Sequence, residues 1–208
     1  MDAADGPKPR PTLRQERAAV TRRRILQAAR LLFFRDGYAA TTLRAVAAEA
    51  GVAVQTVYAV FGSKAAILAE LRALVVSLPE ADDAVRAAMR ETTLEGRLAG
   101  FAHSIRRRWE LAGDIVKVNE DAARADPEIR AGVESAQRRR QEGIGAFADT
   151  LVRDHMVDLH APHAAAIMDA LTMYDLYAQL VGVHGWSADV YERWLSGQLL
   201  SALRSADG

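Results

Sequence analysis

The sequence predicts an all-α fold in which a three-helix helix-turn-helix module precedes a larger helical body. Every substantial segment after residue 12 repeats its apolar residues at helical spacing, and no segment alternates long enough to predict a strand. The 208 residues are 50% apolar and 26% charged, which are ordinary values for a globular protein. A chain of this length forms one domain, or two small ones that share a core.

The composition excludes several classes of site. The chain has no cysteine, so it has no disulfide framework, thiolate metal site or cysteine nucleophile. The N-terminus lacks the apolar stretch of a signal peptide, and the longest uncharged run is far shorter than a membrane span. We therefore expect a cytoplasmic protein with no membrane partner and no cofactor.

Charge is distributed unevenly although the net charge is zero. Residues 1–64 contain 11 basic and 5 acidic side chains, whereas residues 65–208 contain 16 basic and 22 acidic ones. A basic N-terminal part joined to an acidic body is expected when only one end of the chain meets a polyanion.

The N-terminal elements follow in order. Residues 1–12 are rich in proline and carry little that could be buried, so we expect a flexible arm. A long helix should run from Leu13 to Asp36, because apolar residues form one stripe and Gly37 provides a stop. The stripe consists of Ile25, Ala29, Leu32 and Phe33.

Two short helices should follow the long one. The first begins after the N-cap Thr42, and the second spans residues 54–61 after the turn at Gly51-Val52. Short helices joined by a glycine turn predict a helix-turn-helix, in which the second helix is apolar inside and polar outside. A fourth helix should begin after Ser63 and end at Pro79.

The body should consist of four long helical segments. Apolar stripes and capping residues predict helices near residues 94–109, 126–154, 162–183 and 187–203. The segment 162–183 is apolar on two sides, so one side should face its own core and the other a second copy of the chain. We expect the arginine runs 106–108 and 138–140 to lie on solvated faces.

Residues 21–68, TRRRILQAARLLFFRDGYAATTLRAVAAEAGVAVQTVYAVFGSKAAIL, resemble the DNA-binding module of the TetR (tetracycline-repressor-like) family of bacterial transcription regulators. The residues that carry the resemblance are Gly37-Tyr38, Thr41-Thr42, Ala47, Gly51-Val52, Thr56-Val57-Tyr58, Phe61 and Ser63-Lys64. The resemblance implies that residues 13–62 form the DNA-binding domain and residues 63–208 an effector-binding and dimerisation domain.

The resemblance also implies DNA contacts at seven positions. Arg44, Val54 and Gln55 match base-reading positions, and a guanidinium such as that of Arg44 suits the edge of guanine. Thr42, Thr56, Tyr58 and Lys64 match phosphate-contacting positions. Each of three assignments has a structural alternative. Arg44 could be a solvent-exposed helix residue, Tyr58 could lie at the edge of the core, and Lys64 could be an ordinary lysine of the first helical turn. Ala59 and Val60 depart from the family pattern, in which polar or aromatic residues are common.

The function implied is that of a sequence-specific transcription regulator, a homodimeric repressor that a small-molecule effector releases from a palindromic operator in double-stranded DNA. Effectors in this family are enclosed by the middle helices. The candidates here are Phe101, Ile105, Trp109, Asn119, Phe147, Met173, Tyr174 and Tyr177, each of which could equally be a core residue.

Two other functions stay open. A ligand-independent architectural DNA-binding protein would not need so large an acidic body. A helical metal-dependent enzyme would draw on Asp154, His155, Asp158, His160 and His163, but Pro162 breaks the helical phase that would align them. We therefore expect no catalytic residues and no metal.

Overall fold

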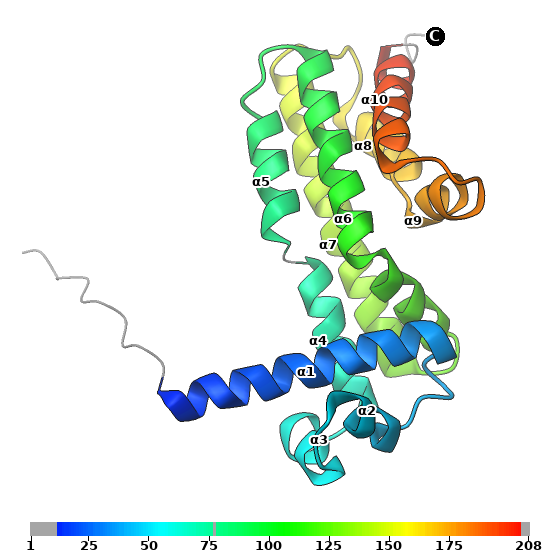
Figure 1. The fold of residues 1–208 in the computed structure, drawn as a ribbon. Helices are drawn as coiled ribbons and strands as arrows, with labels where there is room; N and C mark the ends of the chain where they lie inside the picture. The colour runs from blue at the N-terminus through cyan, green and yellow to red at the C-terminus, as the bar shows by residue number, and fades with distance from the viewer. Residues whose placement is uncertain (1–11, 77, 205–208) are drawn as a thin grey trace, which may run out of the picture. The chain divides into compact units, whose positions relative to one another are not determined.

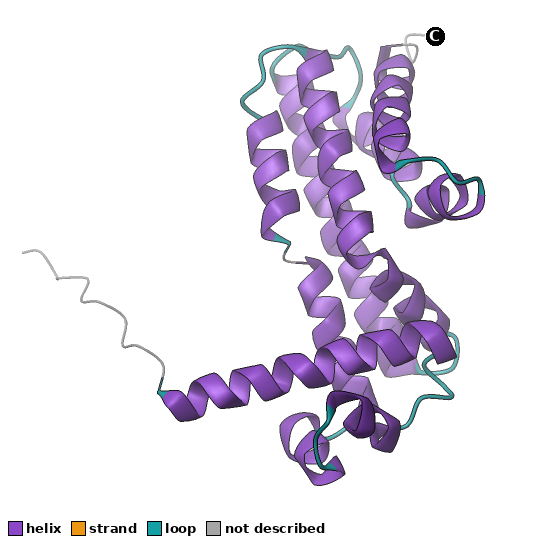
Figure 2. Ribbon diagram, in the orientation of Figure 1, coloured by secondary structure: helices purple, strands orange, loops and turns teal. Residues whose placement is uncertain are grey.

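The computed structural model describes residues 12–76 and 78–204, and every regular element in these residues is a helix (Figures 1 and 2). The predicted all-α fold is confirmed. The chain divides into two compact units, Met1–Leu68 and Ala69–Gly208. The predicted arm lies outside the described residues, except for Thr12, which caps the first helix.

The N-terminal unit contains α1 (Leu13–Asp36), α2 (Leu43–Ala50), α3 (Val54–Phe61) and the start of α4 (Lys64–Val76). Thr12 and Gln15 form a capping box at the start of α1, and Gly37 ends it at a φ of +84°. The predicted apolar stripe of α1 is buried, α1 packs against α2, and the other three helices also carry buried side chains. These are Val46, Ala47, Ala50, Val57, Ile67 and Leu68.

The C-terminal unit is built around α6 (Leu94–Ala123), which packs against α5 (Pro79–Ala88), α7 (Pro127–Arg153) and α10 (Ala188–Arg204). The helix α8 (Ala161–Leu171) packs on α7 and α10. A single apolar core runs between these helices and contains Leu98, Phe147, Leu151, Met168, Tyr191, Leu195 and Leu199.

The segment around Pro79 differs from the prediction. Pro79 is the first residue of α5 and does not merely end α4. A proline fits this position because the first helical N–H has no partner to lose. Leu78 before it is extended, with φ −110° and ψ 97°, as the residue before a proline prefers.

The predicted continuous helix at residues 162–183 is also wrong. The chain breaks after α8 at Thr172 and Met173, and then forms α9 (Tyr174–Tyr177) and the π-helical segment η1 (Ala178–Val183). The hydroxyl of Thr172 donates to the carbonyl oxygen of Met168 at 2.6 Å, and Met173 is extended. This side-chain bond competes with continuation of the helix, which periodicity alone did not reveal.

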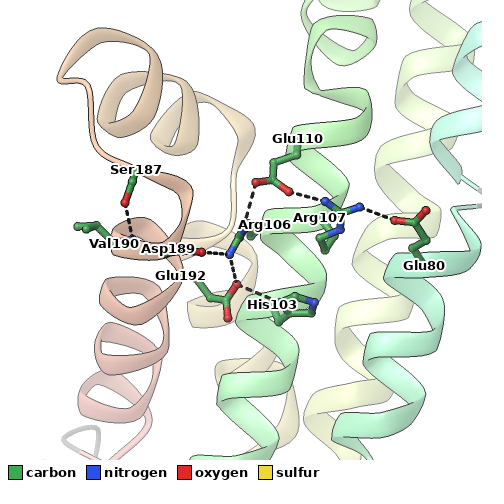
Figure 3. Close-up of polar contacts among 9 residues, drawn as sticks. All are labelled: Glu80, His103, Arg106, Arg107, Glu110, Ser187, Asp189, Val190 and Glu192. Atoms are coloured by element: carbon green, nitrogen blue, oxygen red, sulfur yellow. Dashed lines mark hydrogen bonds and ion pairs between the residues drawn. The ribbon is translucent and has the colours of Figure 1, made fainter.

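Arginines predicted on solvated faces form ion pairs between helices instead (Figure 3). Arg106 of α6 bonds to Glu110 at 3.0 Å, to Glu192 of α10 at 3.1 Å and to Asp189, and its side chain is only 21% exposed. Arg107 pairs with Glu110 and with Glu80 of α5. These pairs link α6 to α5 and α10.

No single helix among the described residues is long and apolar enough to cross a membrane. Among the described residues, α2 and α3 together would have the length and apolar composition of a membrane span, but they are bent by 109° relative to one another.

Candidate DNA-binding surface and ligand cavity

The geometry of α2 and α3 is that of a helix-turn-helix. The two helices are bent by 109° relative to one another across three residues, within the range expected for the motif. Gly51 makes the turn in the left-handed region, at φ +62°. A Cβ at this position would also lie only 2.7 Å from the guanidinium of Arg24. The positive φ favours glycine here, whereas the exposed end of the Arg24 side chain could move away from a Cβ.

The helix α3 is anchored on one side and exposed on the other. Val57 is fully buried, while Gln55 is exposed and Tyr58 is 56% exposed. Val54 and Thr56 lie half-buried at the start of the same helix. This division between an anchored and an accessible face is what base reading in a major groove requires.

The helix α2 supplies the other candidate DNA-contacting residues. Arg44 is exposed in its first turn, and Thr42 caps the helix by accepting a hydrogen bond from the backbone N–H of Ala45 at 3.1 Å. The hydroxyl proton of Thr42 is still available to donate. Thr42 therefore combines a structural role with the donor that a phosphate contact needs.

The end of α3 is held by the first helix. Arg22 lies over the ring of Phe61, 4.5 Å from its centroid, and donates to the carbonyl oxygen of Val60 at 3.4 Å. Phe61 is half-buried beneath this guanidinium.

Lys64, which the sequence predicts as a phosphate contact, binds the chain's own backbone in the structure. Its Nζ donates to the carbonyl oxygens of Tyr38 at 2.5 Å, Ala39 at 3.3 Å and Thr41 at 2.9 Å, and lies 4.3 Å from the Tyr38 ring centroid. Burial lowers the pKa of this ammonium group. An ammonium has three N–H donors, and all three have acceptors here. The structure thus gives Lys64 the role of holding the loop between α1 and α2.

The C-terminal unit contains a partly open cavity of about 560 Å³, within the range typical of small-molecule sites. Six of the eight predicted ligand-binding residues line it: Phe101, Ile105, Trp109, Asn119, Met173 and Tyr174. The other two, Phe147 and Tyr177, do not. Phe147 is fully buried against Phe101, and Tyr177 packs on the rings of Tyr174 and Tyr191.

Glycine allows the close packing of one cavity wall. A Cβ on Gly113 of α6 would overlap the ring of Tyr174, so the ring rests directly on the helix backbone. Trp109 lies on the same helix, with its ring centroid 5.5 Å from that of Tyr174. Its Nε1–H is buried and has no hydrogen-bond partner among the residues that the structure describes.

The cavity wall also contains charged residues that sequence reasoning missed. These are Arg72, Asp82, Arg86, Arg108, Glu120, Arg139 and Arg140. Helical spacing could have found two of them. Arg108 lies seven residues after Phe101, and Arg140 lies four residues before Ile144, so each shares a stripe with apolar cavity residues.

Arg140 connects the cavity wall of α7 to the end of α8. Its guanidinium forms an ion pair with Asp169 and donates to the Thr172 hydroxyl at 2.7 Å. Burial, with a smaller contribution from nearby Arg108, lowers the pKa of Arg140 to about 10. The cation is retained at neutral pH and helps to end α8 at Thr172.

The residues considered for a metal-dependent enzyme do not form a ligand set. Within residues 12–76 and 78–204, no three His, Asp or Glu side chains lie close enough together to hold a metal ion. His160 and His163 approach one another edge to face, with ring centroids 6.1 Å apart.

Comparison with known proteins identifies the N-terminal part. Residues 25–71 match the model for bacterial regulatory proteins of the tetR family. The N-terminal domain belongs to the TetR family. A search among functionally curated proteins finds no match to the chain.

Solved structures of bacterial transcriptional regulators share the fold over most of the chain. PfmR from Thermus thermophilus aligns with a TM-score of 0.65 at 22% identity, covering 89% of this chain and 100% of PfmR. FadR from Bacillus subtilis, solved with stearoyl-CoA, gives 0.71 at 14% identity, covering 88% of this chain and 99% of FadR. A transcriptional regulator from Saccharomonospora viridis, solved with choline, gives 0.66 at 25% identity, covering 86% and 95%. The chain thus has the fold of these regulators, and its residues 25–71 match the tetR-family model.

Proposed function

We propose that this chain is a homodimeric repressor that binds a palindromic operator and is released from it by a small-molecule effector. The observation that carries the DNA-binding part is the accessible face of α2 and α3, with Arg44, Gln55 and Tyr58 exposed above a buried Val57. Arg44, Val54 and Gln55 are assigned to bases, and Thr42, Thr56 and Tyr58 to phosphates.

In this proposal residues 13–62 bind DNA, and residues 63–208 bind the effector and form the dimer. Support for the dimer comes from apolar side chains that stay exposed near the C-terminal helices. Val183 is 68% exposed and Met173 is 53% exposed, while Gly182 and Gly197 leave open space around them. Small residues allow close approach of a partner helix, and a two-fold interface uses the same patch twice.

The effector part rests on the cavity near Trp109 and Tyr174. TetR-family neighbours were solved with ligands as different as stearoyl-CoA and choline, so the fold does not fix the ligand class. A ligand that prefers the dimer spacing unsuited to DNA lowers operator affinity by its differential affinity. The helix α4, which contains both Lys64 and Arg72, is the proposed link.

The experiment is selection of bound genomic fragments by the purified chain, followed by titration of the selected duplex. We expect a two-fold symmetric site and a steep loss of affinity with salt, because a dimer neutralises several phosphates. Arg90→Ala is the matched control for Arg44→Ala, since it removes an exposed arginine from the other unit. Equal binding of all fragments would contradict sequence-specific regulation.

The dimer is tested separately by light scattering. Val183→Glu should shift the chain toward monomer, because a carboxylate would be buried without a partner. A parent chain that is monomeric at micromolar concentration would contradict the dimer.

A further inference from the structure

The cavity has one half-buried cation that no carboxylate neutralises. Arg72 of α4 lines the cavity, and among the described residues it forms no salt bridge within 4.0 Å. Its one hydrogen bond runs from Nη1 to the amide oxygen of Asn119, at 2.8 Å. Glu128 acts on it only at longer range. A guanidinium removed from water in this way lacks the anionic partner that buried cations normally have.

The position of this guanidinium is fixed from two sides. A Cβ on Gly132 of α7 would overlap it, so the guanidinium lies against the α7 backbone. Asn119, which accepts its hydrogen bond, is itself buried and held through its Nδ2, which donates to the carbonyl oxygen of Ile115 at 2.9 Å. The remaining N–H donors of the fork are therefore presented from a defined place.

The charges around Arg72 favour an anion further. Burial, with a smaller contribution from Arg139 on the same cavity wall, lowers the pKa of Arg72. Most other charged wall residues are already paired: Arg108 with Asp82, Arg86 with Asp83 and Arg140 with Asp169. The exception is Glu120, whose pKa is raised by burial and by Asp175. A neutral or cationic ligand would leave the repulsion between the two arginines in place.

The rest of the wall selects an apolar body. Phe101, Ile105, Trp109 and Tyr174 supply apolar and aromatic surface to the cavity. Burial of a ligand's apolar part against these side chains is favourable because it removes apolar surface from water.

We propose that the cavity binds an amphiphilic organic anion, with its acid group on the guanidinium of Arg72 and its apolar body along Phe101, Trp109 and Tyr174. This rests on the proposed function only in taking the cavity as the effector site. A carboxylate is the expected group, because it matches the arginine fork with two parallel hydrogen bonds.

Isothermal titration of the full chain without DNA tests this directly. The probes are octanoate and octanamide, 1-naphthaleneacetate and 1-naphthaleneacetamide, and octyltrimethylammonium, which pair similar apolar bodies with different charges. We expect at least one carboxylate to bind about tenfold or more tightly than its amide, as charge-assisted hydrogen bonds allow, and the ammonium to bind weakest. If neither carboxylate binds, if both amides bind equally well, or if the ammonium binds best, the proposal is overturned.

Two variants locate the acid group. Arg72→Gln should remove the preference for carboxylate over amide, and Arg72→Lys should restore part of it. Arg86→Gln removes the same charge from an exposed position on the cavity wall and should keep the full preference. A preference that survives in Arg72→Gln would overturn the assignment. The titrations of the parent chain alone determine whether the ligand is an anion. The proposal can therefore be tested even if a variant folds poorly.

The outcome separates this inference from the proposed function. Carboxylate binding that leaves a selected operator complex intact would support the anion site and contradict effector release. If the chain binds a selected operator but shows no preference for carboxylates, the DNA-binding part of the proposed function is supported and the anion site is contradicted.

Discussion

The two units present their polar residues in different ways. In the N-terminal unit the residues assigned to DNA lie within one short stretch, Thr42 to Tyr58, on two adjacent helices whose apolar sides are buried. The cavity of the C-terminal unit instead draws Arg72, Asp82, Arg108 and Arg140 from four different helices. A DNA-reading surface is thus local in sequence, whereas the ligand site exists only after the body has folded.

The contrast between the two units is tested most strongly at Lys64, a residue of the N-terminal unit that contacts the protein's own backbone. Lys64→Met should lower the free energy of unfolding by about 3 kcal/mol, because it leaves carbonyl oxygens of Tyr38, Ala39 and Thr41 without their charged donor. Urea unfolding measures the change. A variant as stable as the parent that merely binds all DNA sequences more weakly would favour the phosphate contact predicted from the sequence.

A base-reading residue should behave in the opposite way. Arg44→Ala should cost about 1 to 3 kcal/mol of affinity for the selected operator and relax one base position. Its effect on stability should stay within about 0.5 kcal/mol, because the side chain is exposed. Mobility-shift titration against operator variants measures both affinity and specificity. Unchanged discrimination at every position would remove Arg44 from the base-reading set.

The cavity wall can be disturbed without touching the DNA-binding residues. Gly113→Ala should lower the free energy of unfolding by about 1 to 2 kcal/mol, because the new Cβ displaces the Tyr174 ring. Ligand affinity should fall with it. Thermal unfolding with and without a bound carboxylate provides the measurement, and an unchanged ligand effect would place Tyr174 outside the site.

The matched change on α7 should have the smallest effect and the opposite sign. Gly145→Ala meets no atom within 4 Å, so it should raise the free energy of unfolding by about 0.5 to 1 kcal/mol through helix propensity alone. The same urea titration measures it. Destabilisation by this variant would show that glycine substitutions in this unit act generally and not through Tyr174.

The local elements could be predicted from the sequence because their causes are local. The helices from Leu13 to Phe61 begin and end where the caps and glycines indicate, and Val57 and Phe33 are buried as their spacing predicts. The helix-turn-helix could be recognised for the same reason. The start of α5 at Pro79 was missed because a proline is compatible with both the end and the beginning of a helix. The break at Thr172 was missed because it involves a side-chain hydrogen bond to Met168 that apolar periodicity does not reveal.

The charged residues of the cavity depend on contacts between distant segments. Arg140 pairs with Asp169 on another helix, and Arg72 meets Asn119 from 47 residues away. The arginine run 138–140 does not reveal Asp169 as a partner, because such runs normally mark a solvated face, and nothing in the sequence around Arg72 points to Asn119. Of the aromatic and apolar candidates, Phe101, Ile105, Trp109 and Tyr174 line the cavity, because large side chains on a helical stripe usually face the interior wherever the partner helix comes from.

The most direct test of the account is a binding titration with one selected duplex and a second in which both half-sites are scrambled. Fluorescence anisotropy of the full chain at physiological salt gives both affinities. The account predicts that the selected duplex binds about a thousandfold or more tightly, as for specific DNA-binding proteins in general. Equal affinity for the two duplexes would contradict sequence-specific reading by α2 and α3.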